Sequence, residues 1–176
     1  MTKPVILFFC LLPCLSSAQT FADTFNLSIP DDGNIGYYDI EVSGLPTQTS
    51  ENFGVVTICI NLTHTWNADL FITLIAPDGT EAELTSDNGG DNTCFNSSSA
   101  LGIWEASWPY TGTFKPEGFL SVFQNGQNPN GTWRLKIRDT YPFADAGVLF
   151  DWGITFGPNP PTPYPFLSST LPIVKI

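Results

Sequence analysis

Hydrophobic residues along this chain recur at every second position in several short rows. Successive side chains of a β-strand point to opposite faces, so this period of two predicts strands with one buried face. No stretch of useful length shows the period of a helix. The rows are Val56/Ile58/Ile60/Leu62, Leu70/Ile72/Leu74, Trp133/Leu135/Ile137 and Val148/Phe150/Trp152/Ile154/Phe156.

Residues typical of tight turns lie between these rows. Pro77-Asp78-Gly79 predicts a hairpin turn, because proline sets the first turn dihedral and glycine accepts the left-handed position. Short strands with frequent turns and no helices predict an all-β protein, an antiparallel β-sandwich with Trp133 and Trp152 in its core. The further turn pairs are Asp32-Gly33, Asn88-Gly89, Asn125-Gly126 and Asn130-Gly131.

Composition divides the chain into four parts. Residues 1–18 have the features of a secretory signal peptide, with Lys3, an apolar run over 4–15 and cleavage after Ala18. Residues 19–157 are expected to form one domain, and 158–170 a proline-rich, extended linker. Residues 171–176 resemble a strand without a partner, which either begins a further, truncated module or docks on the sandwich as an edge strand. We therefore expect a secreted, extracellular protein.

The charge of the chain is strongly negative. Six Lys and Arg stand against 17 Asp and Glu, a formal net charge of −11. Loss of the signal peptide removes Lys3 and leaves five basic residues, a charge near −12. Such a surface repels phosphate backbones and anionic membranes, which excludes a nucleic-acid partner and favours cations as ligands. After the signal peptide, no stretch is long and apolar enough for a transmembrane segment.

The cysteines predict one disulfide. Cys10 and Cys14 leave with the signal peptide, so a secreted chain retains the pair Cys59 and Cys94. Cys59 alternates with the apolar row around it, so we expect it on the opposite face, bridged to a covering loop. Closing a loop of about 35 residues stabilises by roughly 3–4 kcal/mol in the chain-entropy model.

Catalysis by this chain alone is not expected. A Ser-His-Asp triad needs a histidine as its general base, and His64 is the single histidine. Its place at a strand end, next to Thr65, favours a structural hydrogen-bonding role. The sequence also lacks a Gly-x-Ser-x-Gly, His-Glu-x-x-His or Cys-x-x-Cys motif.

A set of motifs in a fixed order resembles the P domain (P/Homo B domain) of secreted subtilisin-like proprotein convertases and bacterial exported proteins. The resemblance covers about residues 23–157. It implies a jelly-roll β-sandwich, like a galactose-binding domain, that packs on a serine endopeptidase domain and supports its folding and calcium dependence. The motifs are His64-Thr65, Asp69-Leu70, Pro77-Asp78-Gly79-Thr80, the loop 86–92, the run 111–118, the strand 131–139, and Gly147, Leu149, Trp152 and Phe156.

One loop is the best candidate for a calcium site. Calcium prefers six to eight oxygen ligands from carboxylates, amides and backbone carbonyls, and a glycine-rich loop can fold such groups inward. The family has acidic residues after this loop where the present chain has Asn96-Ser97-Ser98-Ser99, which counts against the site. The alternative is a solvated loop of Asx turns. The candidate ligands are Asp87, Asn88, Asp91 and Asn92, with Asp69 or Asp139 completing the shell.

Two surface groups are candidates for partner binding. Arg134, Lys136 and Arg138 alternate on one strand, either as a docking stripe for an acidic partner or as cross-strand partners of acidic neighbours such as Asp151. A second group lies in a segment without clean alternation. It serves core packing, a protein interface or a carbohydrate platform, and it consists of Trp104, Trp108 and Tyr110.

These observations predict a secreted, non-catalytic accessory module. It would stabilise or position a partner, either a subtilisin-like catalytic domain or another exported module, and so serve proteolysis through a neighbour. The alternative is an adhesive or carbohydrate-binding jelly roll on a cell-surface protein.

Overall fold

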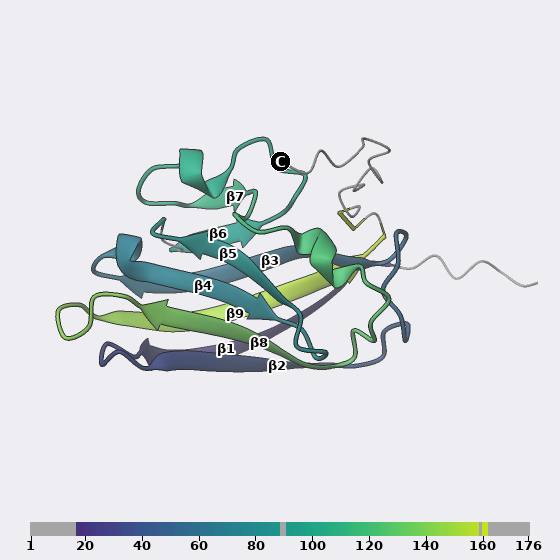
Figure 1. Ribbon diagram of the computed structural model, residues 1–176, viewed down its shortest axis with the longest axis horizontal. Coiled ribbons are helices and arrows are strands. Elements are labelled where there is room, and N and C mark those ends of the chain that lie inside the picture. The colour runs from purple at the N-terminus through teal and green to yellow at the C-terminus, as the bar shows by residue number, and fades with distance from the viewer. Residues whose placement is uncertain (1–16, 89–90, 159, 162–176) are drawn as a thin grey trace, which may run out of the picture.

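Two β-sheets packed face to face make up the computed structural model, which describes residues 17–88, 91–158 and 160–161 (Figure 1). Most of the expected signal peptide and all of residues 171–176 lie outside the described residues, as does most of the expected linker. The all-β sandwich predicted from the alternating rows is confirmed. None of the helices in the described part is long and apolar enough to cross a membrane.

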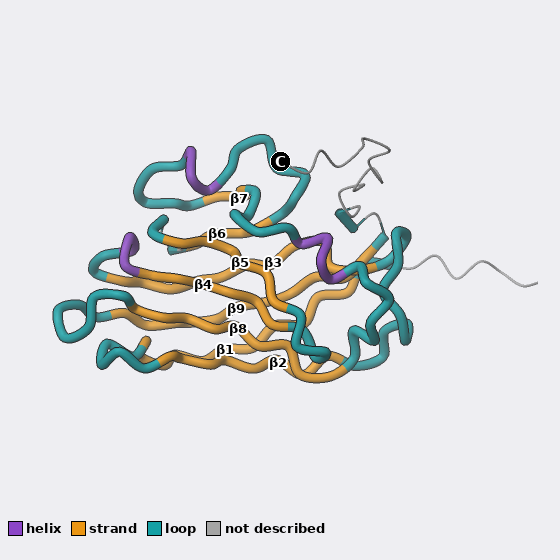
Figure 2. The backbone as a smooth tube through the Cα atoms, viewed as in Figure 1, coloured by secondary structure: helices purple, strands orange, loops and turns teal. Residues whose placement is uncertain are grey.

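The strands are divided between a five-stranded sheet, ordered β1-β9-β3-β6-β7, and a four-stranded sheet, ordered β2-β8-β4-β5. Figure 2 shows the two layers of strands, with loops gathered at both ends. The described strands are β1 (Gln19–Ile29), β2 (Ile35–Val42), β3 (Gly54–His64), β4 (Leu70–Ile75), β5 (Glu81–Ser86), β6 (Asn92–Phe95), β7 (Gly112–Phe114), β8 (Gly131–Asp139) and β9 (Gly147–Gly157). Three short 3-10 helices are η1 (Asn67–Asp69), η2 (Ile103–Glu105) and η3 (Leu120–Phe123).

One strand pair departs from the antiparallel pattern that the sequence predicts. β6 and β7 run parallel, with Cys94 opposite Thr113. The segment between them, residues 96–111, includes η2 and is long enough to carry the chain back before it pairs again. A parallel pair requires such a crossover of about a dozen residues or more, whereas a tight turn suffices for a hairpin.

Aromatic side chains form the centre of the core between the sheets. Trp133 of β8 and Trp152 of β9 are fully buried, as predicted. The Trp133 ring packs edge-to-face against the rings of Phe156 and Phe123. The ring centroids are 5.3 Å and 5.2 Å apart, respectively. The Trp133 indole N–H donates to the Pro129 carbonyl at 2.8 Å, so its polar atom is satisfied inside the core.

β-Bulges change which side chains face this core. In β3 the register against β9 shifts between Val55 and Thr57, so Val55 is fully buried and Val56 is half-buried. The prediction that Val56 belongs to the inward row was therefore wrong, because an extra residue reverses the alternation that follows.

The same effect changes the inward row of β9. Its pairing with β3 skips one residue between Asp151 and Leu149. Leu149 is therefore fully buried, while Val148 and Phe150, which we expected in the inward row, are half-buried. Trp152, Ile154 and Phe156 lie beyond the bulge and face the core as predicted.

The predicted disulfide between Cys59 and Cys94 is confirmed, but its partner element was not foreseen. The two residues lie directly opposite each other on β3 and β6, with their Cα atoms 4.0 Å apart. Cys59 does face away from the core, on the exposed side of β3. The bridge therefore joins two neighbouring strands of one sheet instead of fastening a covering loop.

Replacing both cysteines by serine should lower the free energy of unfolding by about 3–4 kcal/mol, because the unfolded chain regains the freedom of the open loop. Urea unfolding followed by tryptophan fluorescence measures this loss. A reducing agent should cause a similar loss in the wild-type protein and no further loss in the double variant. An unchanged urea midpoint in the double variant would contradict the prediction.

Candidate functional site: two cavities beside Trp66

Two loops lie side by side at one end of the sandwich because each crosses from one sheet to the other. The β3–β4 loop contains η1, and the β8–β9 loop covers residues 140–146 (left end of Figure 1). The strands that flank them pair with each other, β3 with β9 and β4 with β8. The Thr65 N–H donates to the Ala146 carbonyl at 3.0 Å, and the Thr140 N–H donates to the Asp69 carbonyl at 2.8 Å. The two loops are therefore held together by their backbones.

His64 occupies a structural position where the two loops begin. Its side chain is 1 % exposed, and its Nε2 lies 3.2 Å from Oδ2 of Asp139, whose side chain is 0 % exposed. Since a carboxylate only accepts, the Nε2 proton is the donor. The His64 Nδ1 lies 2.8 Å from the Trp66 carbonyl oxygen, and Asp139 Oδ1 accepts the Tyr141 N–H at 2.9 Å. Both ring nitrogens thus contact protein groups.

Gly147 makes this packing possible. A Cβ atom there would collide with the His64 ring and lie 2.8 Å from the Thr63 carbonyl oxygen. The glycine of the family motif therefore permits a close approach of β9 to the buried histidine.

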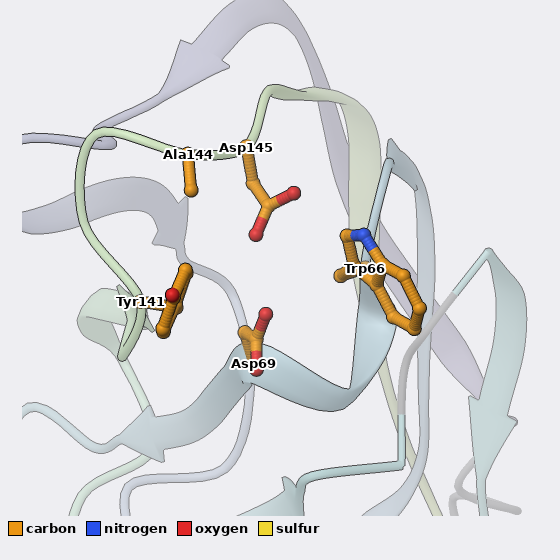
Figure 3. Close-up of a pocket in the computed structure, with 5 residues that line it drawn as sticks. All are labelled: Trp66, Asp69, Tyr141, Ala144 and Asp145. Carbon is orange, nitrogen blue, oxygen red and sulfur yellow. The ribbon is translucent and has the colours of Figure 1, made fainter.

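The first cavity has a volume of about 370 Å³ and two carboxyl groups in it. Figure 3 shows the side chains of Asp69 and Asp145 pointing toward each other between the rings of Trp66 and Tyr141. Thr65 Oγ1 donates to Asp145 Oδ1 at 2.8 Å and orients that carboxylate. The cavity therefore combines negative charge with exposed aromatic walls.

The electrostatics of this cavity raise the pKa of Asp69 above its ordinary value of 3.8. Desolvation is the largest cause, followed by the hydrogen bond to the Asp145 carboxyl group and the charges of Asp145 and Asp139, while His64 acts in the opposite direction. The neighbouring negative charge and the loss of hydration both favour the protonated form of Asp69.

Trp66 also lines a second cavity, of about 300 Å³, together with Asn67, Trp108 and Tyr110. Trp66 and Trp108 are 66 % and 75 % exposed, so their indole rings are available to a ligand. Asn67 is 6 % exposed and donates from Nδ2 to Asp91 Oδ1 at 2.9 Å. Its Oδ1 has no hydrogen-bond partner within the described residues.

The six candidate calcium ligands fall into separate hydrogen-bonded groups. Asp69 lines the first cavity with Asp145, which the sequence did not single out, whereas Asp139 is buried against His64. Asn88 Nδ2 donates to Glu117 Oε1 at 2.6 Å, whereas Asp91 is bonded to Asn67. Asp87 is exposed with a φ of 60°, and Asn92 pairs with Asn61 on β3. Among the described residues, no three His, Cys, Asp or Glu side chains are grouped so that they could hold a metal ion.

The structure separates the three aromatic residues that the sequence grouped together. Trp104 lies in η2 and lines a different cavity with Phe119 and Lys115. Trp108 and Tyr110 line the second cavity beside Trp66, and Tyr110 also packs against the core. Trp66 and Tyr141 were missed, because an isolated loop aromatic carries no periodic signal.

The basic row on β8 lies on the outer face of the four-stranded sheet. Arg134 donates to both carboxylate oxygens of Asp39 on β2, at 2.6 and 2.7 Å. Lys136 donates to Glu81 on β5 at 2.8 Å, and Arg138 is exposed. Asp151 belongs to the other sheet and accepts from Asn61 instead. Ion pairs this exposed to solvent contribute little to stability.

The chain is a two-sheet β-sandwich whose loops at one end line two cavities. The family model that matches residues 53–156 is that of the proprotein convertase P-domain, and the chain belongs to this family. The resemblance identified in the sequence is thereby confirmed. P domains of this family are associated with protease catalytic domains.

Relatives from bacteria and Hydra share this domain. The chain is 29% identical to the transglutaminase-activating metalloprotease of Streptomyces mobaraensis over 78% of its own length and 15% of the relative's. It is 30% identical to leupeptin-inactivating enzyme 1 of Streptomyces exfoliatus, over 78% of this chain and 26% of the other. PC3-like endoprotease variant B of Hydra vulgaris is 29% identical over 54% of this chain and 11% of its own length. The chain thus spans a small part of each relative.

Among solved structures, the serine protease of Aeromonas sobria matches with a TM-score of 0.47 and 20% identity, covering 81% of this chain and 28% of that one. Its complex with the chaperone ORF2 matches with a TM-score of 0.48 and 19% identity, over 82% and 28% of the two chains.

The raised pKa of Asp69 should fall in an Asp145→Asn variant, because the neighbouring carboxyl group is removed. It should stay above the ordinary value, because desolvation, the largest cause, remains. Carbon-detected NMR titration of the carboxyl groups measures both proteins. Asp32, whose pKa is lowered by hydrogen bonds from Asn34, serves as a control that should not change. An unaltered Asp69 titration would show that the two carboxyl groups do not interact.

The raised pKa of Asp69 also determines the direction in which stability changes with pH. Between the unfolded pKa and the raised folded pKa, the folded protein binds more protons than the unfolded chain, so stability falls as pH rises through this window. Asp69→Asn should remove that part of the pH dependence.

Proposed function

We propose that this chain is a non-catalytic accessory domain that stabilises or positions a protease catalytic domain outside the cell. The observation that carries the proposal is that this chain matches only a fraction of each relative. The matched segment makes up 15% and 26% of two bacterial relatives, one of which is named a metalloprotease. A third relative is named a PC3-like endoprotease, so the shared segment recurs in a second protease.

The chemistry of the chain supports a role through contact. His64 is buried and bonded to Asp139, which suits a structural group better than a general base that must reach a substrate. The sandwich is a compact body with a disulfide between β3 and β6. A domain that binds only the folded state of its neighbour stabilises that state by mass action, and a covalent link raises its effective concentration to about millimolar.

An antibody against residues 19–157 should capture, from the secreted fraction, a protein with proteolytic activity and a mass well above the 19.2 kDa of this chain. Mass spectrometry and casein cleavage measure these properties. The recombinant chain alone should not cleave casein. A captured species of the chain's own mass, without an associated protease, would contradict the proposal.

Within the native protein, Trp133→Ala should shorten the thermal half-life of the protease, because the loss of a buried tryptophan costs about 3–5 kcal/mol in the accessory domain. Glu51→Gln, on an exposed turn, is the matched control and should leave the half-life unchanged. Equal half-lives for the two variants would mean that the domain does not stabilise the protease.

Calcium is proposed as an ion that stabilises the loop around residues 87–92. The fit comes from Asn67, whose buried Oδ1 is unpaired within the described residues and whose side chain is bonded to Asp91. Carboxylate and amide oxygens of this kind are suited to calcium. Asp91 and Asn67 would hold the ion, and its charge would offset the acidity of the loop.

Calcium chloride should raise the melting temperature in a saturable way, above the effect of magnesium chloride at equal ionic strength, because magnesium requires a near-octahedral shell and gives up its water reluctantly. Asp91→Asn should abolish this difference. Asp69→Asn, at the first cavity, tests whether that group contributes. Identical curves for the two salts in the wild-type protein would remove calcium from the proposal.

A second candidate function is an adhesive or carbohydrate-binding jelly roll. The specific observation in its favour is that two exposed indole rings, Trp66 and Trp108, line one cavity. Oligosaccharide titration, included in the binding experiment described next, tests it.

A further inference from the structure

The two loops that line the cavities beside Trp66 are joined to each other by hydrogen bonds within the chain. In addition to the backbone bond from the Thr65 N–H to the Ala146 carbonyl, the Ala146 N–H donates to Thr65 Oγ1 at 3.0 Å. Thr140 Oγ1 donates to the Asp69 carbonyl at 2.9 Å. These contacts fix the loop positions from which Asp69 and Asp145 extend. A site formed in advance loses less conformational entropy when it binds.

The chemistry of the first cavity matches an organic cation. The carboxyl groups of Asp69 and Asp145 meet between the rings of Trp66 and Tyr141, which are 66 % and 63 % exposed (Figure 3). An ammonium or guanidinium group can donate to both carboxylates while an aromatic face attracts its charge. Arg134 and Lys136, two basic residues of this chain, are engaged with Asp39 and Glu81 on the four-stranded sheet.

The second cavity matches an apolar side chain next to a backbone amide. Trp108 and Trp66 offer aromatic surface, and Tyr110 lies at the same cavity. In the calcium-free protein, the buried side-chain oxygen Oδ1 of Asn67 has no partner within the described residues, and it can accept a hydrogen bond from a ligand N–H. An unpaired buried acceptor gains more from a new partner than an exposed one does.

The shared wall allows one extended ligand to occupy both cavities. Trp66 lines each of them. Alternate side chains of an extended peptide project from the same face, roughly 7 Å apart. A segment that places a basic side chain in the first cavity can therefore present an apolar side chain to the second.

We propose that the cavities beside Trp66 bind an extended polypeptide segment of a partner protein in which a lysine or arginine lies two positions from an apolar residue. The negative charge of the chain, −11 in formal terms, complements such a segment and accelerates the encounter. The proposal deepens the accessory function, since it specifies the chemistry of the partner's contact segment. Peptide binding is measured on this chain alone and is therefore separable from whether the partner is a protease.

The test titrates the full chain with a blocked peptide that carries arginine and leucine two positions apart. Chemical shifts of the Trp66 and Trp108 indole N–H groups report binding by NMR, and calorimetry gives the affinity. Replacing arginine by citrulline, its uncharged isostere, should weaken binding roughly tenfold or more, the effect of losing a charge-assisted pair. Binding should also weaken as salt rises. Replacing leucine by glycine should weaken binding without changing its salt dependence.

Variants of the protein locate the site. Asp69→Asn combined with Asp145→Asn should weaken binding of the arginine peptide roughly tenfold or more. Binding of the citrulline peptide should be nearly unaffected, because only the charged pair is lost. Trp66→Ala should weaken binding of both peptides. The matched controls are Trp104→Ala, an exposed tryptophan at a different cavity, and Glu51→Gln, an exposed carboxylate, and neither should change the affinity. Melting curves verify that each variant is folded.

Three outcomes would overturn the proposal. The first is the absence of saturable shifts at the Trp66 and Trp108 indoles with millimolar peptide. The second is an equal loss of affinity in the Trp104→Ala control, which would indicate nonspecific aromatic contact. The third is binding of a chitin or cellulose hexasaccharide that requires Trp66 and Trp108 while the arginine peptide fails to bind, which would favour the carbohydrate function.

Discussion

A buried polar contact between the two sheets determines the geometry of the end where the cavities lie. His64 ends β3 in one sheet and Asp139 ends β8 in the other, and their side chains meet at 3.2 Å with almost no exposure. Desolvation offsets much of the attraction in such a pair, so its main contribution is to position. The same two side chains also contact the backbones at Trp66 and Tyr141, the residues whose rings flank the first cavity.

Much of the sandwich follows from local sequence. Leu70, Ile72 and Leu74 lie on one face of β4 and are fully buried, because an uninterrupted strand keeps a period of two. The turn at Gly79 has a φ of 86°, the left-handed conformation that the Pro-Asp-Gly sequence predicts. Where the period is interrupted, at Val55–Thr57 and near Phe150, prediction fails, because a bulge depends on the partner strand and leaves no clear mark in the sequence.

The candidate site was less predictable than the core, because its parts meet only through the sheet topology. Asp69 was selected from a family motif, whereas Asp145, the carboxyl group that faces it, belongs to a loop that carries no recognisable motif. Their proximity requires that β3 pairs with β9 and β4 with β8. Trp104 and Trp108 show the reverse error, since they are close in sequence and line different cavities.

The distribution of exposed aromatic groups explains why a partner would contact the loops instead of a sheet face. On the outer face of the four-stranded sheet, Arg134 and Lys136 are already paired with neighbouring carboxylates, so docking there would require those pairs to be rearranged. The most exposed large hydrophobic residues of the described chain all lie outside strands. Burying such rings provides the favourable term of an interface, and the fixed loops keep its entropic cost low. These residues are Phe143, Trp108, Trp66, Phe119 and Tyr141.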